Sequence, residues 1–158
     1  MKKIFLFIFM MFIIPISVNA DSMYNIDMDI YIDKNGNADI TDDKIYVYDE
    51  KSLDKYLNKN IYDIYSERLN YWYNVFEEDI PVPNLKIRKM TSRWGVCNIR
   101  NHNVTLNYML YKYDICCLDY VIVHELSHFI HPNHSSEFWN LVGKYYPKYK
   151  ECRKMLKE

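Results

Sequence analysis

The pattern His-Glu-Leu-Ser-His at residues 124–128 constrains this chain more than any other part of its sequence. The stretch around it has the character of a helix, which turns by about 100° per residue, so positions i and i+4 lie on one face. His124 and His128 can therefore bind one zinc ion together, and Glu125 is placed to act as a general base on a water at that ion. The alternative is a surface helix that carries these three residues by chance, and the flanking residues argue against it.

A catalytic zinc site needs a third protein ligand and one open position. Pro132 disfavours a helical conformation at His131, so the helix should end there and the chain should turn. His134 then returns within reach of the metal. We favour His134 over His131, because a ligand beyond the turn closes a tripod better than a third imidazole along the same helix axis. His131 would then contact a ligand or the substrate, or act as a cation at the helix C-terminus. His102 is expected to be exposed or structural.

Several separated motifs follow one another in an order that is typical of a known family. They are residues 92–97 (SRWGVC), 104–107 (VTLN), 118–128 (LDYVIVHELSH), 133–135 (NHS) and 138–139 (FW). On these motifs the sequence resembles the YgjP-like metallopeptidases, which are relatives of the SprT-like and WLM metalloproteases. The resemblance extends over residues 55 to 155, and several motifs in the right order are far more specific than H-E-x-x-H alone.

The resemblance implies a role for each residue of the candidate site. Zinc would be bound by His124, His128 and His134, and Glu125 would be the catalytic glutamate. The sequence departs from the family pattern at Val96, where serine is usual. This departure leaves the implied metal ligands intact and puts only a role for that serine in doubt.

The first twenty residues form a separate segment. Lys2 and Lys3 precede an apolar run at residues 4–18, and small residues at 18–20 precede Asp21. A basic start, an apolar stretch and small residues at the cleavage position are typical of a secretory signal peptide. The run is shorter than the roughly twenty residues that a membrane-spanning helix needs. We therefore expect an exported protein with a cleaved signal, and a retained N-terminal anchor is the alternative, although relatives in the family are mostly cytoplasmic.

Residues 21–50 form an acidic segment, in which nine Asp and Glu face two Lys. Apolar residues alternate along 26–32, the turn-forming sequence DKNGN follows at 33–37, and the alternation resumes at 38–40. This pattern predicts an acidic β-hairpin. A calcium-binding loop is not expected, because Gly36 occupies the fourth place of the loop pattern, where the EF-hand requires glycine at the sixth.

Residues 51–158 are expected to form the metallopeptidase domain. They carry sixteen Lys and Arg against twelve Asp and Glu, a mild excess that is usual for a solvated surface. No basic stripe interleaved with aromatic residues stands out, so binding to nucleic acid is weakly supported. Contact with a membrane is expected only through the N-terminal segment.

The hydrophobic spacing predicts a small α+β domain in which the H-E-x-x-H helix packs on a small β-sheet and the acidic hairpin precedes both. The resemblance to the metallopeptidase family implies that this domain is zincin-like. A long amphipathic helix is expected before Pro81. The other expected elements are a strand from 85 into 92–95, a strand at 104–107 paired with it through a turn near Asn101, a helix at 114–131, a helix between 135 and 147, and a last short helix that holds Tyr149, Cys152 and Leu156.

Three residues of the family motifs admit both a functional and a structural interpretation. Arg93 would either orient substrate and stabilise an oxyanion or stack on an aromatic ring. Trp94 is expected to belong to the core. Asn107 is expected to be a buried amide with its hydrogen bonds satisfied, although contact with an extended substrate is the alternative.

The four cysteines are Cys97, Cys116, Cys117 and Cys152. None has Cys-x-x-Cys spacing, so no second, structural zinc site is expected. In an exported protein they could form disulfides in three pairings, and free thiols are the alternative.

The sequence therefore predicts a zinc-dependent metallopeptidase that hydrolyses a peptide or protein substrate with Glu125 as general base. One alternative keeps the metal but cleaves a phosphoanhydride of a nucleotide. A second alternative is a zinc-stabilised binding module without activity.

Overall fold

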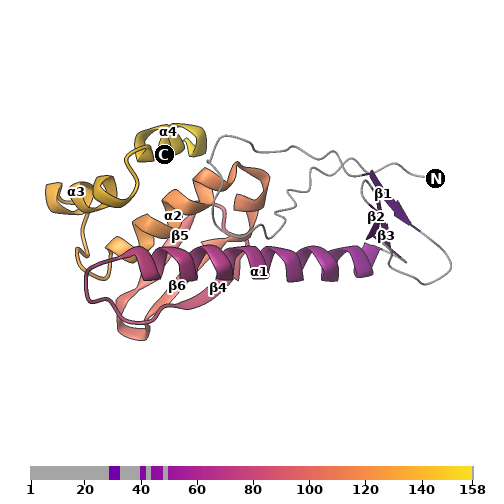
Figure 1. Ribbon diagram of the computed structural model, residues 1–158, viewed down its shortest axis with the longest axis horizontal. Helices are drawn as coiled ribbons and strands as arrows, with labels where there is room; N and C mark the ends of the chain where they lie inside the picture. Colours follow the sequence, from indigo (N-terminus) through magenta and orange to yellow (C-terminus); the bar gives the residue numbers. More distant parts are fainter. Residues whose placement is uncertain (1–28, 33–39, 42–43, 48–49, 158) are drawn as a thin grey trace. The chain divides into compact units, whose positions relative to one another are not determined.

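The computed structural model describes residues 29–32, 40–41, 44–47 and 50–157 (Figure 1). Contacts along the chain form two units, Met1–Asn60 and Ile61–Glu158, and every residue of the candidate site belongs to the second. The predicted signal segment at residues 1–20 lies outside the described residues. Among the described residues, no helix has the length and apolar character that crossing a membrane requires.

The first unit contains a small sheet of strands β1 (Asp29–Ile32), β2 (Ile40–Thr41) and β3 (Lys44–Val47) in the order β1-β3-β2. Strand β1 pairs in parallel with β3, and β2 pairs antiparallel with β3. The predicted hairpin of residues 26–32 with 38–40 is therefore wrong, because β3 lies between the two strands. The residues Ile45, Tyr46 and Val47, which have high β-propensity, form this middle strand.

The second unit contains a three-stranded sheet and most of the helices. Its strands are β4 (Asn84–Arg88), β5 (Gly95–Asn98) and β6 (Asn103–Asn107), in the order β4-β6-β5. Strand β4 is parallel to β6, whereas β5 and β6 form an antiparallel hairpin through the 3₁₀ turn η1 (Ile99–Asn101). The predicted turn near Asn101 is thus confirmed, but the single strand expected from 85 into 92–95 is two separate strands.

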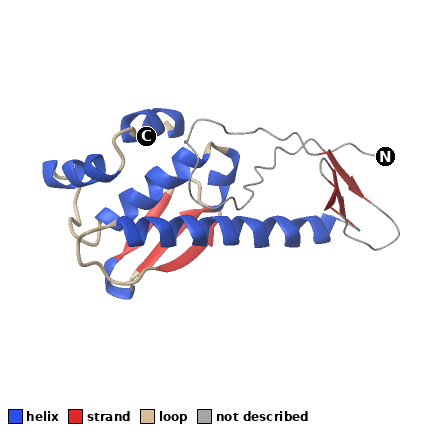
Figure 2. Cartoon of the chain, in the orientation of Figure 1, coloured by secondary structure: helices blue, strands red, loops and turns tan. Residues whose placement is uncertain are grey.

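Helix α1 (Glu50–Val75) begins in the first unit and continues into the second. The elements that follow the sheet are η2 (Tyr108–Lys112), α2 (Ile115–Ser127), α3 (Ser136–Tyr145) and α4 (Tyr149–Leu156). Helix α2 contacts β5, β6, α3 and α4, and Figure 2 shows it beside the strands of the sheet. The expected α+β architecture with helices on a small sheet is confirmed for this unit.

Helix α2 is buried on almost every side, which fits its largely apolar sequence ICCLDYVIV. The core that it forms with its neighbours combines aromatic and aliphatic side chains that are less than 3% exposed, among them Tyr120, Ile122 and Leu126 of α2 itself and Tyr65, Leu69, Leu106, Leu110 and Phe138 from other elements. This surrounding core fixes α2 in rotation and position. The residues at its C-terminal end are therefore presented from a rigid element.

An ion pair ties α1 to α2 within the second unit. The Arg68 guanidinium donates to both carboxylate oxygens of Asp119 at 2.6 Å, and the side chains are only 19% and 10% exposed. Arg68→Ala would leave the Asp119 carboxylate largely buried without this partner, and such a loss costs about 3–5 kcal/mol in proteins. We expect a fall of that order in the free energy of unfolding, measured by chemical denaturation.

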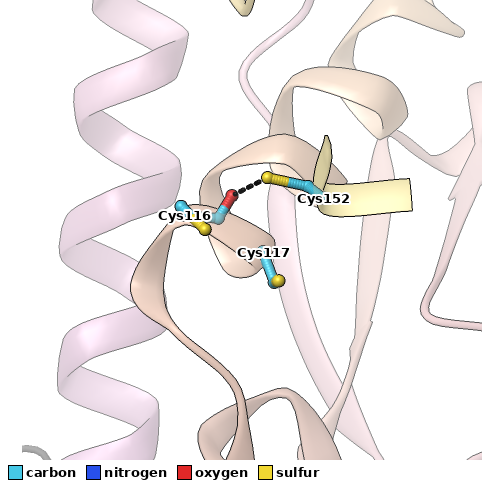
Figure 3. Close-up of side chains that lie close together, drawn as sticks. All are labelled: Cys116, Cys117 and Cys152. Carbon is cyan, nitrogen blue, oxygen red and sulfur yellow. Dashed lines mark hydrogen bonds between the residues drawn. The ribbon is translucent and has the colours of Figure 1, made fainter. Parts of the chain in front are cut away.

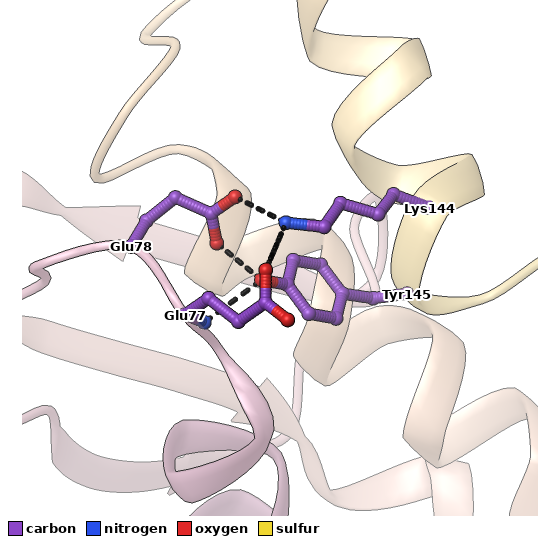
Figure 4. A network of polar contacts seen from close by, with 4 residues as sticks. All are labelled: Glu77, Glu78, Lys144 and Tyr145. Carbon is purple, nitrogen blue, oxygen red and sulfur yellow. Dashed lines mark hydrogen bonds and ion pairs between the residues drawn. The ribbon is translucent and has the colours of Figure 1, made fainter.

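A more exposed network provides the control for this substitution. The Lys144 ammonium lies 2.9 Å from carboxylate oxygens of Glu77 and Glu78, and the Tyr145 hydroxyl donates to Glu78 (Figure 4). The Lys144 side chain is 45% exposed, so water replaces its partners when it is lost. Lys144→Ala should therefore destabilise the protein much less than Arg68→Ala, and equal effects would contradict the role given to the Arg68–Asp119 pair.

Candidate active site

Helix α2 positions three of the residues that the sequence singles out. Its first turn is capped by Asp114, whose carboxylate accepts a hydrogen bond from the Cys116 backbone N–H at 2.8 Å. About three turns later the helix presents His124 and Glu125, and His128 caps its C-terminus with helical dihedral angles (φ −68°, ψ −19°). The two histidines therefore share one face, as the spacing predicts.

His134 reaches the same place from the turn that follows Pro132. The next helix, α3, begins there, with the Ser135 hydroxyl accepting from the Phe138 N–H at 3.4 Å. Phe138 is fully buried, and the rings of His124, His128 and His134 surround it at centroid distances of 4.8, 4.6 and 4.8 Å. One aromatic side chain thus supports all three imidazoles.

The three imidazoles each offer one ring nitrogen to a common point. These nitrogens all lie within 4.8 Å of one another, and the Nε2 atoms of His134 and His124 are 2.9 Å apart. The structure thus brings His124, His128 and His134 together, as the sequence analysis expects of metal ligands. Among the described residues the side chain of His131 is not part of this group.

Hydrogen bonds hold two of the rings in orientation. The Nδ1 atom of His128 lies 3.1 Å from the backbone carbonyl oxygen of His131, to which it can only donate, so Nε2 keeps its lone pair. The Nδ1 atom of His124 lies 3.4 Å from the Tyr120 hydroxyl. Contacts of this kind are typical of metal-binding histidines. The function of His131 at this site is therefore carried by its backbone, whereas His102 is exposed in the β5–β6 turn, as expected.

The surroundings favour the neutral form of the two helix imidazoles, His124 and His128. Burial, with smaller contributions from the neighbouring His128 and His134, lowers the pKa of His124 to about 3. Burial also lowers the pKa of His128, with a smaller contribution from His134 and against the opposing effect of the His131 carbonyl. Because a histidine must be unprotonated to bind a metal, His124 and His128 are ready to do so at neutral pH.

Glu125 lies on the side of the group that faces the motif at residues 92–97. Its side chain is 4% exposed and packs directly on Gly95 at the start of β5. Both line a pocket of about 750 Å³, together with the three histidines and all six residues of that motif. The pocket therefore combines a possible metal centre with a buried carboxylate.

Gly95 allows this close approach because it has no side chain. A Cβ atom at this position would lie 2.7 Å from Glu125 Cγ and 2.8 Å from Cδ, too close for either to remain in place. Since the Glu125 side chain can move, we expect Gly95→Ala to fold and to retain the three histidines in place. Its hydrolytic rate should fall at least about tenfold, because a misplacement of 1 Å can cost a hundredfold.

The matched control is Gly143→Ala in α3. A Cβ atom there meets only Tyr149 Cε1, at an ordinary distance of 3.5 Å. Alanine in place of a helical glycine should stabilise the protein by roughly 1 kcal/mol without altering activity. If Gly95→Ala were as active as Gly143→Ala, the packing of Glu125 on Gly95 would have no part in catalysis.

Comparison with known proteins places these features in a family. The model of the YgjP-like metallopeptidase domain matches residues 16–158. The chain belongs to the YgjP-like metallopeptidase family. This is the family that the sequence motifs indicated, and the match begins well upstream of residue 55, where the resemblance in the motifs begins. The protein is accordingly a hydrolase of the metallopeptidase class.

Two solved structures are similar to this chain. The metallopeptidase zymogen abylysin of Pyrococcus abyssi is 22% identical, with a TM-score of 0.45, over 62% of this chain and 90% of its own. The metallopeptidase zymogen jannalysin of Methanocaldococcus jannaschii is 27% identical, with a TM-score of 0.45, over 61% of this chain and 92% of its own. A comparison with curated protein sequences gives no match. The family assignment rests on the family model.

The YgjP-like motif at residues 92–97 shapes one wall of the pocket. Arg93 is exposed there, and no aromatic ring among the described residues stacks on its guanidinium. The Trp94 indole, which is expected in the core from the sequence, is partly buried: it packs against the core, donates to the Leu156 carbonyl at 3.2 Å and also lines the pocket. Asn107 is 2% exposed and bonds the backbone of Met90 and Arg93, which confirms the buried, satisfied amide.

Residues from the C-terminal end of the chain also line the pocket, and the sequence motifs do not indicate them. Arg153 of α4 lies with its guanidinium 4.4 Å from the Trp139 ring, which in turn stacks on His134 at 5.6 Å. Lys157 lines the same pocket. Both residues are far from the H-E-x-x-H motif in the sequence, so no motif or spacing indicates that they line its pocket. With Arg93 they make three cationic side chains around the pocket, where Glu125 is the one acidic side chain among the described lining residues.

Cys97 also lines the pocket and faces Glu125. Burial, and after it the charge of Glu125, raises the pKa of its thiol to about 12. The thiol therefore stays protonated at neutral pH. Because only the thiolate is a strong nucleophile, Cys97 is unsuited to attack a substrate.

Proposed function

We propose that this metallopeptidase binds one zinc ion through His124, His128 and His134 and hydrolyses peptide bonds with Glu125 as general base. The observation that carries this proposal is the group of three imidazole nitrogens within 4.8 Å of one another beside a buried glutamate in a pocket. Three protein ligands with one side open to a pocket is the arrangement of catalytic zinc sites.

The donor set fits zinc. Neutral imidazoles are good zinc ligands, and two of them on a tetrahedral ion with Zn–N distances of about 2.0–2.1 Å are separated by roughly 3.3 Å. The separation of 2.9 Å between His124 and His134 Nε2 differs from this by a few tenths of an ångström. Because His134 is exposed, its ring can make that adjustment without disturbing the core.

When bound, zinc would supply a Lewis acid for the scissile carbonyl and would lower the pKa of a water in its open position towards 7. Glu125 would take up the proton of the attacking water and later deliver it to the leaving amine. Its packing on Gly95 holds the carboxylate in the pocket beside His124 and His128. His131 and Tyr120 would hold the rings of two ligands in orientation through the contacts at Nδ1.

The pocket also favours a class of substrate. Strand β5 is an edge strand of the sheet and pairs only with β6 among the described strands, and its residues Gly95, Val96 and Cys97 line the pocket. An extended peptide can pair with such an edge through its backbone. Since Arg93, Arg153 and Lys157 surround the pocket, we propose that the preferred peptides or proteins carry acidic side chains close to the cleaved bond.

A direct test offers the zinc-loaded protein a peptide library in which each acidic peptide has a matched lysine counterpart. Faster cleavage of the acidic peptides than of their lysine counterparts would support the proposal. Arg93→Ala should raise KM for the acidic peptides and so reduce the difference in kcat/KM between the two sets. Nucleoside triphosphates offered in parallel test the phosphoanhydride alternative. Zinc binding without turnover of either substrate class would identify a binding module and overturn the proposed function.

We further propose that the protein is exported. The basis is the sequence of the first twenty residues, with its basic start, its apolar run and the small residues before Asp21. N-terminal sequencing of the protein from cell fractions and medium should yield Asp21 as the first residue. An intact Met1 on cytoplasmic protein would overturn export, and an intact Met1 on membrane-bound protein would indicate an anchor.

A further inference from the structure

Three of the four cysteines gather at a place away from the active-site pocket. Cys116 and Cys117 lie in the first turn of α2, and Cys152 lies on α4, which packs against α2. Figure 3 shows the three side chains close together, with the Cys152 thiol donating to the Cys116 carbonyl at 3.3 Å. Cys117 and Cys152 are at most 1% exposed, whereas Cys116 is partly exposed.

The positions of the sulfur atoms fit a metal ion better than a disulfide. All three Sγ atoms lie within 4.8 Å of one another. Thiolates bound to one zinc at about 2.3 Å are separated by roughly 3.8–4.0 Å, so small side-chain movements would enclose an ion. A disulfide would instead bring two sulfurs to about 2.05 Å and leave the third cysteine as a free thiol.

The site would have a chemistry different from that of the histidine group. Thiolates are soft ligands, which favour zinc, cadmium and monovalent copper over magnesium or calcium. Burial raises the pKa of all three thiols, so the ion itself would have to displace their protons on binding. Binding of a divalent ion would release three thiol protons to the solvent and leave one coordination position for water.

We propose that Cys116, Cys117 and Cys152 form a second metal site, which takes a thiophilic ion such as zinc and joins α4 to α2. Helix α4 also supplies Arg153 and the Leu156 carbonyl bonded by Trp94, both beside the active-site pocket. An ion at the cysteines would therefore fix the position of a pocket wall without touching substrate. The spacing of the cysteines along the sequence does not predict such a site, because its ligands come together only when α4 folds against α2.

Cadmium is the probe that distinguishes the two sites. Reduced, metal-free protein is saturated with cadmium chloride and desalted, and bound cadmium and sulfur-to-cadmium charge-transfer absorption are measured. Imidazole ligands give no such absorption. Wild type should hold two ions per chain and show the absorption. Cys117→Ala should hold one ion and lose the absorption, whereas His134→Ala should hold one ion and keep it.

Two further variants complete the design. Cys97→Ser removes a thiol outside the cluster and should keep both ions and the absorption. If Cys117→Ala fails to fold by circular dichroism, Cys116→Ser at the partly exposed position replaces it. Wild-type protein without the charge-transfer absorption would overturn the proposal. So would the loss of the absorption in Cys97→Ser, or a count of two free thiols in unreduced protein, which indicates a disulfide.

Discussion

Glu125→Gln should lower the rate of peptide hydrolysis at least a hundredfold and leave the zinc content unchanged. Glutamine has the size and shape of glutamate but cannot take up the proton of the attacking water, and removal of a general base costs about 10²–10⁴ in rate. The Glu125 side chain is buried against Gly95, and glutamine fills the same space, so the packing is preserved. The three histidines of the proposed metal site are unchanged by the substitution. Steady-state kinetics and metal analysis on the same preparation measure the two effects.

The matched control is Glu137→Gln in the first turn of α3. This residue is exposed and does not line the pocket, so the same chemical change should leave the rate unaltered. A loss of activity confined to Glu125→Gln, with KM little changed, indicates a role in the chemical step rather than in binding. Comparable rates for wild type and Glu125→Gln would remove this residue from the mechanism.

The histidine group could be predicted because its geometry is mostly local. His124 and His128 share a face through the period of the helix alone, and the helix stops before Pro132. Placing His134 required one further step, the turn that returns the chain to the metal. The structure adds Phe138, whose ring fixes all three imidazoles and whose role no spacing could show.

Features that depend on long-range pairing were predicted less well. The parallel pairing of β4 with β6 and of β1 with β3 cannot be inferred from alternation, which indicates strands but not their neighbours. For the same reason the expected acidic hairpin is wrong. Arg153 at the pocket and Cys152 in the thiol cluster both lie on α4, so both features depend on how the last helix packs on α2.

His134→Ala should remove most of the zinc from the active site, whereas His131→Ala should not. The Nε2 atom of His134 is 2.9 Å from that of His124, and its side chain is exposed, so alanine removes a ligand without opening the core. Loss of even an outer-sphere partner lowers metal affinity by about 10–100-fold, so loss of a direct ligand should exceed a hundredfold. Competition with a chromophoric chelator gives the affinity of each variant.

His131→Ala is a sharp control because this residue supports the site through its backbone. The carbonyl oxygen that accepts from His128 Nδ1 remains in the alanine variant, as does the hydrogen bond from its own N–H to the Ser127 carbonyl at 2.9 Å. We therefore expect the variant to keep the arrangement of the three histidines and to bind zinc with an affinity within a few-fold of wild type. If His131→Ala lost the metal and His134→Ala retained it, the third ligand would be His131 and not His134. The turn after Pro132 would then have no part in metal binding.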